Sequence, residues 1–155
     1  MNAYTFYQQE KERKLRELEE RKAAQMREQE RIQAIVVRKL NEFLDQLTQG
    51  FEGITFQIAY DSHPTIEVKV QQGDIYSDKA SRVHDFVFSL NWYWHSNTSP
   101  IEQKRLTKLT FGYDGYTLDF PANRLTDQEW RREMVYNLVR VSLGEIYPSD
   151  DDLPF

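Results

Sequence analysis

Apolar positions divide the chain into a charged N-terminal stretch and a longer stretch with regular apolar spacing. Residues 8–31 are mostly polar or charged, and acidic residues precede basic ones by four positions, as in Glu10 and Lys14. This spacing stabilises an exposed helix. From residue 32 onward the apolar side chains fall on one helical stripe, which predicts that residues 32–48 pack on a core. Gly50 is expected to end this helix.

A helix over residues 5–48 would be roughly 65 Å long at ~1.5 Å per residue, so its first half should extend beyond a small domain. Apolar residues in that half are too few to define a heptad seam. We therefore interpret residues 1–31 as a solvated helical arm, with a weak coiled coil or a partner-binding arm as the alternative. Its few apolar residues include Leu15, Leu18, Ala23, Ala24 and Met26.

Alternation of apolar and polar residues predicts strands in the middle of the chain. Asp114 and Gly115 stand between two alternating runs, which is a strong hairpin signal. Thr126 and Glu129 form a capping box that opens a second helix, expected over residues 127–143, and Gly144 is expected to end it. The five expected strands lie near residues 54–60, 66–70, 84–94, 105–112 and 116–120.

These elements predict an α+β fold, in which an antiparallel sheet of about five strands is covered on one face by two helices and a long charged helical arm precedes it. The other face of the sheet should be solvated. The expected domain organisation has three parts: residues 1–31 form the arm, residues 32–147 form a two-layer α+β domain, and residues 148–155 form an acidic tail.

The residue content offers little for catalysis. The chain has no Cys, which excludes disulfides, thiolate catalysis and Cys-ligated zinc. His63 falls in an expected turn, while His84 and His95 lie at opposite ends of one expected strand and on opposite faces. No phosphate-binding glycine loop, HExxH or GxSxG motif occurs. We therefore predict that the protein is not an enzyme and uses no cofactor and no metal.

No apolar run approaches the ~20 residues that cross a bilayer. The N-terminal residues also lack the apolar region of a signal peptide. These features predict a cytoplasmic protein with no membrane partner.

Single-stranded nucleic acid is usually held by stacking rings and a basic groove. The net charge is −5, and most strand aromatics fall on the expected core face. Core packing is therefore the favoured interpretation of these rings, with base stacking as the alternative. The candidate nucleic-acid contacts are Tyr93 on the open face and the basic residues Lys104, Arg105, Lys108, Arg131 and Arg132.

The most specific pattern is the final six residues, Asp150-Asp151-Asp152-Leu153-Pro154-Phe155. If Phe155 is the terminal residue, it carries both a phenyl ring and an α-carboxylate. Pro154 restricts its own backbone and biases the preceding Leu153 toward an extended conformation. Such a peptide fits an apolar pocket with Arg or Lys on its rim. We refer to these six residues as the acidic tip.

The acidic tip resembles the C-terminal tip of bacterial single-stranded DNA-binding proteins, and the resemblance covers the last six to eight residues. In that family the tip recruits replication, recombination and repair proteins. The resemblance implies that the same six residues are a partner-binding motif here, and that the partners are proteins that recognise such tips. The peptide that binds bacterial sliding clamps, which also ends in a Leu and Phe pair, is a nearby alternative.

Three functional hypotheses follow. The first is an accessory protein of bacterial, phage or plasmid DNA metabolism that docks onto replication or repair proteins through the acidic tip. The second is a single-stranded DNA-binding protein that lacks the oligonucleotide-binding barrel and carries the same tip. The third is a structural adaptor in which the helix of residues 1–49 assembles with a partner or with itself as a homo-oligomer, while the acidic tail only keeps the protein soluble.

Overall fold

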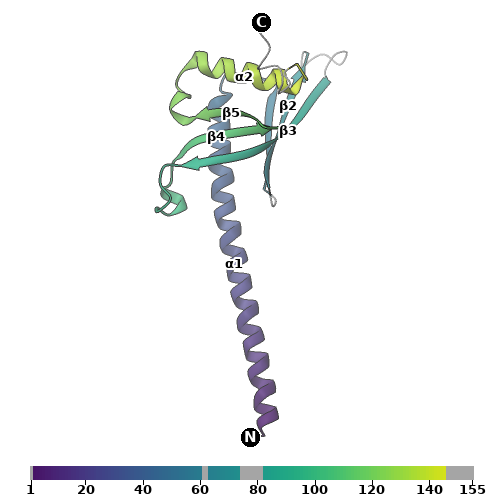
Figure 1. Cartoon of the computed structure of the whole chain (residues 1–155), viewed down its shortest axis with the longest axis vertical. Coiled ribbons are helices and arrows are strands. Elements are labelled where there is room, and N and C mark those ends of the chain that lie inside the picture. The colour runs from purple at the N-terminus through teal and green to yellow at the C-terminus, as the bar shows by residue number, and fades with distance from the viewer. Residues whose placement is uncertain (1, 61–62, 74–81, 146–155) are drawn as a thin grey trace. The chain divides into compact units, whose positions relative to one another are not determined.

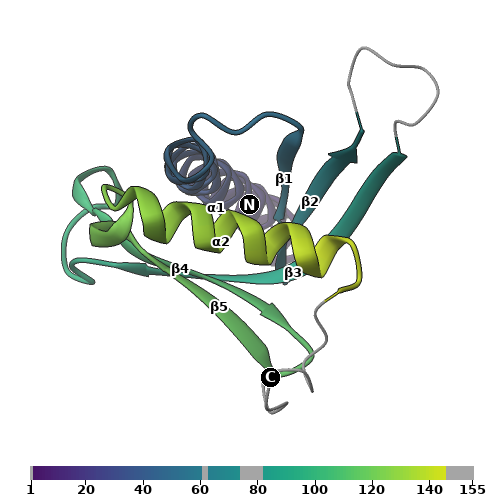
Figure 2. The ribbon, with the colours of Figure 1, turned by 90° about the horizontal axis from the view of Figure 1, so that it is seen from above.

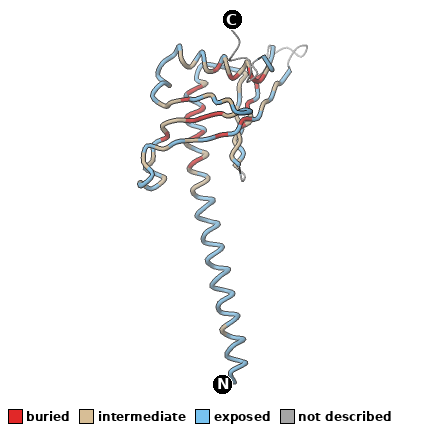
Figure 3. Tube along the Cα trace, in the orientation of Figure 1, coloured by how far each residue is buried: buried red, intermediate tan, exposed pale blue. Residues whose placement is uncertain are grey.

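A computed structural model describes residues 2–60, 63–73 and 82–145 of the chain. The chain divides into two compact units, residues 1–36 and residues 37–155. Helix α1 (Ala3–Leu47) contributes to both units. In the first unit, residues 3–31 are exposed almost throughout, as the pale blue tube in Figure 3 shows. No helix among the described residues is both long and apolar enough to cross a membrane.

The second unit contains one five-stranded sheet in which each strand pairs antiparallel with the next along the chain (Figure 1). The strands are β1 (Ile54–Tyr60), β2 (Pro64–Gln72), β3 (Arg82–Trp94), β4 (Leu106–Tyr113) and β5 (Tyr116–Pro121). Two short 3-10 helices, η1 (Ile101–Gln103) and η2 (Ala122–Arg124), precede β4 and follow β5. The predicted α+β fold with an antiparallel sheet of five strands is confirmed.

The two helices cover the same face of the sheet. Helix α2 (Gln128–Ser142) packs against β2 and β3 and crosses the strands in Figure 2. Buried strand residues alternate with exposed ones, so one side of each strand meets the helices and the other side meets solvent. The fully buried apolar side chains include Leu40, Leu44, Leu47, Ile66, Val68, Phe88, Leu90, Leu109, Phe111, Phe120 and Leu138.

Aromatic rings connect neighbouring strands within this core. The ring of Phe111 lies 5.6 Å from Phe88 on β3 and 4.7 Å from Phe120 on β5, measured between ring centroids. Phe120 in turn meets Trp130 of α2 edge to face at 5.9 Å. The sequence-based assignment of the strand aromatics to the covered face is therefore confirmed for Phe88 and Phe120, which are fully buried.

The turns form where the sequence signals predict them. Asp114 and Gly115 both have positive φ, 47° and 85°, as a tight hairpin turn between β4 and β5 requires. Gly144 has φ 74°, and the backbone N–H of Glu145 donates to the carbonyl of Arg140, which closes α2 in a Schellman motif.

Two local predictions are wrong. The N-cap of α2 is Asp127 and not Thr126, since the Asp127 side chain accepts a hydrogen bond from the backbone N–H of Trp130 at 3.1 Å. Thr and Asp are both favourable N-cap residues. The chain that leaves η2 brings Asp127, and not Thr126, to the N-cap position of α2. The strands expected near residues 66–70 and 84–94 are also too short, because Gln72 pairs with Arg82 and extends β2 and β3.

Candidate functional site

The acidic tip, Asp150, Asp151, Asp152, Leu153, Pro154 and Phe155, lies outside the described residues. Helix α2 ends at Ser142, and Glu145 is the last residue that the structure describes. The first residue of the tip, Asp150, therefore lies eight positions after the end of α2 in the sequence. Its role as a partner-binding motif stays a prediction.

Two of the six candidate nucleic-acid residues, Tyr93 and Lys108, are in contact with each other. They are paired across β3 and β4 on the open face, and the Lys108 ammonium lies 4.5 Å from the centroid of the Tyr93 ring. Tyr93 is 48% exposed, so part of its ring is accessible to a ligand. A ring beside a cation can contact a base and a phosphate.

The rest of the open face carries charges of both signs. Lys69 forms an ion pair with Glu67 at 3.2 Å, and both residues lie on β2. Asp119 on β5 accepts a hydrogen bond from the Thr110 hydroxyl at 2.8 Å. The carboxylates on this face reduce the positive potential that would attract a phosphate backbone.

Arg131 has a role within the fold. Its guanidinium donates to the backbone carbonyl of Gln46 at 3.1 Å and to that of Gln49 at 3.5 Å, which satisfies carbonyl groups at the end of α1. Arg132, the next residue, is exposed on α2. The two arginines that are adjacent in sequence therefore do not act as one basic patch.

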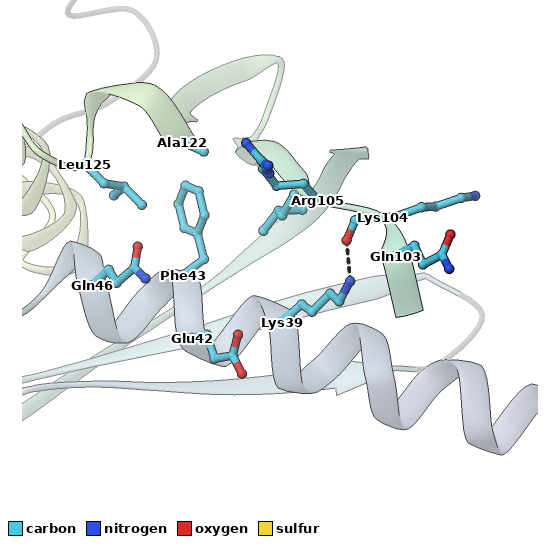
Figure 4. Close-up of a pocket in the computed structure, with 10 residues that line it drawn as sticks. Lys39, Glu42, Phe43, Gln46, Gln103, Lys104, Arg105, Ala122 and Leu125 are labelled. Atoms are coloured by element: carbon cyan, nitrogen blue, oxygen red, sulfur yellow. Dashed lines mark hydrogen bonds between the residues drawn. The ribbon is translucent and has the colours of Figure 1, made fainter. Parts of the chain in front are cut away.

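Lys104 and Arg105 line a pocket of about 460 Å³ between the C-terminal part of α1, the start of β4 and η2 (Figure 4). Phe43, Leu106 and Leu125 give it an apolar surface. The remaining lining residues are Lys39, Glu42, Gln46, Gln103 and Ala122.

Lys39 holds one wall of this pocket in place. Its ammonium donates to the carbonyl of Ile101 at 3.0 Å and to that of Glu102 at 3.3 Å, and it also donates to the carbonyl of Lys104. These bonds satisfy carbonyl groups of η1 and attach that segment to α1. The same ammonium lies 5.5 Å from the ring of Trp94. Because its charge is engaged in this way, Lys39 contributes structure more than ligand binding.

Arg105 stands between this pocket and a second hollow, since Arg105, Leu106 and Ala122 line both. The second hollow also includes His95, whose backbone N–H donates to the Arg105 carbonyl at 2.8 Å. The combined surface can accept an apolar side chain and offers a cation to an adjacent anion. Sequence reasoning identified Lys104 and Arg105 but missed Phe43 and Leu125, because the pocket joins segments far apart in the chain.

The described residues provide no assembled catalytic centre at this pocket. His84 shares a hydrogen bond with Gln72 at 2.6 Å and is remote in sequence from the lining residues. Within the parts of the chain that the structure describes, no group of three His, Asp or Glu residues could hold a metal ion. Comparison with known protein families, with curated proteins and with solved structures found no match.

Proposed function

We propose that the protein is an accessory protein of DNA metabolism, of bacterial, phage or plasmid origin, that binds replication or repair proteins through its acidic tip. The observation that carries the proposal is the sequence Asp150-Asp151-Asp152-Leu153-Pro154-Phe155. The proposal requires that Phe155 bears the free α-carboxylate. Partners of this kind place the protein in the cytoplasm.

The energetics of such a tip follow from its residue types. The Phe155 ring contributes apolar burial, and its carboxylate accepts charge-assisted hydrogen bonds from Arg or Lys on the receptor. The three Asp residues add long-range attraction to a basic rim, which raises the association rate more than the affinity. A single short peptide of this kind binds at about micromolar Kd, or about −8 kcal/mol.

The test is displacement of a fluorescent tip peptide from a purified protein that recognises tips of single-stranded DNA-binding proteins. The full chain is expected to displace the labelled peptide completely, because both occupy one pocket. Bovine serum albumin, which is also acidic, serves as the control for non-specific charge effects. If the full chain leaves the anisotropy of the bound peptide unchanged, the proposed function is wrong.

A second candidate function is binding of single-stranded DNA on the open face, and the accessible pair of Tyr93 and Lys108 favours it. A labelled dT oligonucleotide should then bind at low salt, with an affinity that falls steeply as salt rises. Replacing Tyr93 and Lys108 by Ala should remove this binding, whereas replacing Lys69 by Ala should change it little. A flat titration with the unmodified chain excludes this function.

A further inference from the structure

An apolar stripe with an 11-residue period runs along the first unit. Tyr4, Leu15 and Met26 are separated by eleven residues each, and Tyr7 and Leu18 repeat the same interval. Eleven residues complete three helical turns with a remainder of about 20°, so these five side chains share one face of α1. A search for heptads does not detect this period.

The stripe is accessible in the single chain. Its five side chains are between 46% and 65% exposed, although all are apolar or aromatic. A shallow pocket of about 300 Å³ lies along part of the stripe. The residues that line this pocket are Tyr7, Glu10, Lys11, Lys14, Leu15 and Leu18.

The two edges of the stripe carry opposite charges. Glu12 and Glu19 lie on one edge, and Glu30 continues it eleven residues further on. Lys14 and Arg21 lie on the other edge, because two residues correspond to about 200° around a helix. The basic edge also carries Glu10 and Glu28, but Arg13 and Arg31 form ion pairs with these two carboxylates. The charges of each edge that are left without an ion pair among the described residues therefore have one sign.

Glu12, Glu19, Glu30, Lys14 and Arg21 have no ion pair with the described residues of their own chain, whereas the carboxylates that flank the basic edge are paired with arginines on the back of the helix. Arg13 lies on the back and forms ion pairs with Glu10 at 2.7 Å and with Glu17 at 3.6 Å, which flank the basic edge. The hydrogen bond to Glu10 and the charges of both carboxylates raise the pKa of Arg13. The charges that border the apolar stripe thus remain available to a second molecule.

We propose that residues 4–30 pair with the same residues of a second copy of this chain, parallel and in register. Parallel pairing about a two-fold axis brings the acidic edge of each helix against the basic edge of the other. Glu12 then faces Lys14 of the second copy, and Glu19 faces Arg21. Antiparallel pairing instead places acid against acid and base against base. The 11-residue period corresponds to a pair with a slight right-handed twist.

Two lysines near the middle of the stripe fit this arrangement. In the parallel pair, Lys11 lies opposite Lys11 of the second copy, and Lys22 lies opposite Lys22. The two like charges of each pair repel each other, which by itself disfavours the dimer. Their long stems reach Glu12 and Glu19 of that copy, which lie within one helical turn along the axis. The pairing therefore provides each lysine with a carboxylate across the interface.

Self-association is independent of the acidic tip and is measured without a tip receptor. The functional consequence of self-association does rest on the proposed function. In a parallel pair the C-terminal ends of the two helices lie side by side, so one dimer offers two tips to a target. Such a pair gains affinity for a multivalent target through effective concentration.

Sedimentation equilibrium of the full chain tests the pairing. The mass is expected to rise from 18.6 kDa toward twice that value with concentration. Reversing one edge, with Glu12→Lys and Glu19→Lys or with Lys14→Glu and Arg21→Glu, should weaken self-association by roughly tenfold or more. Mixing the two reversed chains should restore a dimer. A monomeric mass for the unmodified chain at every concentration overturns the proposal.

Cross-linking tests the orientation. Because the chain has no native Cys, the only disulfide that a single-Cys variant can form between two copies joins the two introduced residues. Met26→Cys should form a disulfide-linked dimer on oxidation, because parallel pairing places the two thiols opposite each other. Ala24→Cys is the matched control, since it lies about 200° away from Met26 around the helix. Cross-linking of both variants to the same extent, or of neither, overturns the parallel arrangement.

Discussion

Deletion of Phe155 is expected to weaken binding to a tip-recognising protein by roughly 30-fold to 1000-fold, corresponding to loss of an aromatic hot spot. The deletion removes the ring and moves the terminal carboxylate onto Pro154. Isothermal titration calorimetry with the full chain and the deleted chain measures the change. The melting temperature should not move, because the buried core residues that the structure describes all precede Gly144.

Two further variants separate the ring from the charge. Phe155→Ala keeps a terminal carboxylate and should lose most of the affinity, since the pocket is then left without its apolar occupant. Ser149→Ala, just outside the acidic tip, is the matched control and should bind as the unmodified chain does. Equal affinity for the unmodified chain and the Phe155 deletion would show that the tip is not the docking element.

Replacing Phe111 by Ala is expected to lower the free energy of unfolding by about 3–5 kcal/mol. Phe111 is 1% exposed and its ring contacts Phe88 and Phe120, so the substitution leaves a cavity at the centre of the sheet. Urea unfolding followed by circular dichroism measures the loss. Phe111→Leu keeps most of the volume and should cost roughly 1.5 kcal/mol or less. A loss below ~1 kcal/mol for Ala would contradict the assigned core.

The architecture of the second unit could be predicted because one face of each strand is buried. In such strands a shift of one residue would move every apolar side chain into solvent, so alternation specifies the face. Asp114 and Gly115 likewise define their turn through backbone conformations that few residue pairs adopt. These signals are local, and the structure follows them.

The contacts of the charged residues could not be predicted because they depend on segments distant in sequence. Arg131 resembles a surface cation in the sequence, yet it donates to carbonyls at the end of α1. Lys39 is similarly engaged with η1, more than sixty residues away. The pocket beside Lys104 and Arg105 arises from the same packing. The 11-residue stripe is visible in sequence, but only when that period is sought.

The most direct measurement of the central claim is chemical-shift mapping of the isotopically labelled full chain during titration with a tip-recognising protein. We expect the amide signals of residues 150–153 and 155 to shift or broaden first, while those of the sheet and α2 stay in place. Shifts confined to the sheet and α2, with the acidic tip unchanged, would contradict the account, because the docking surface would then lie on these elements.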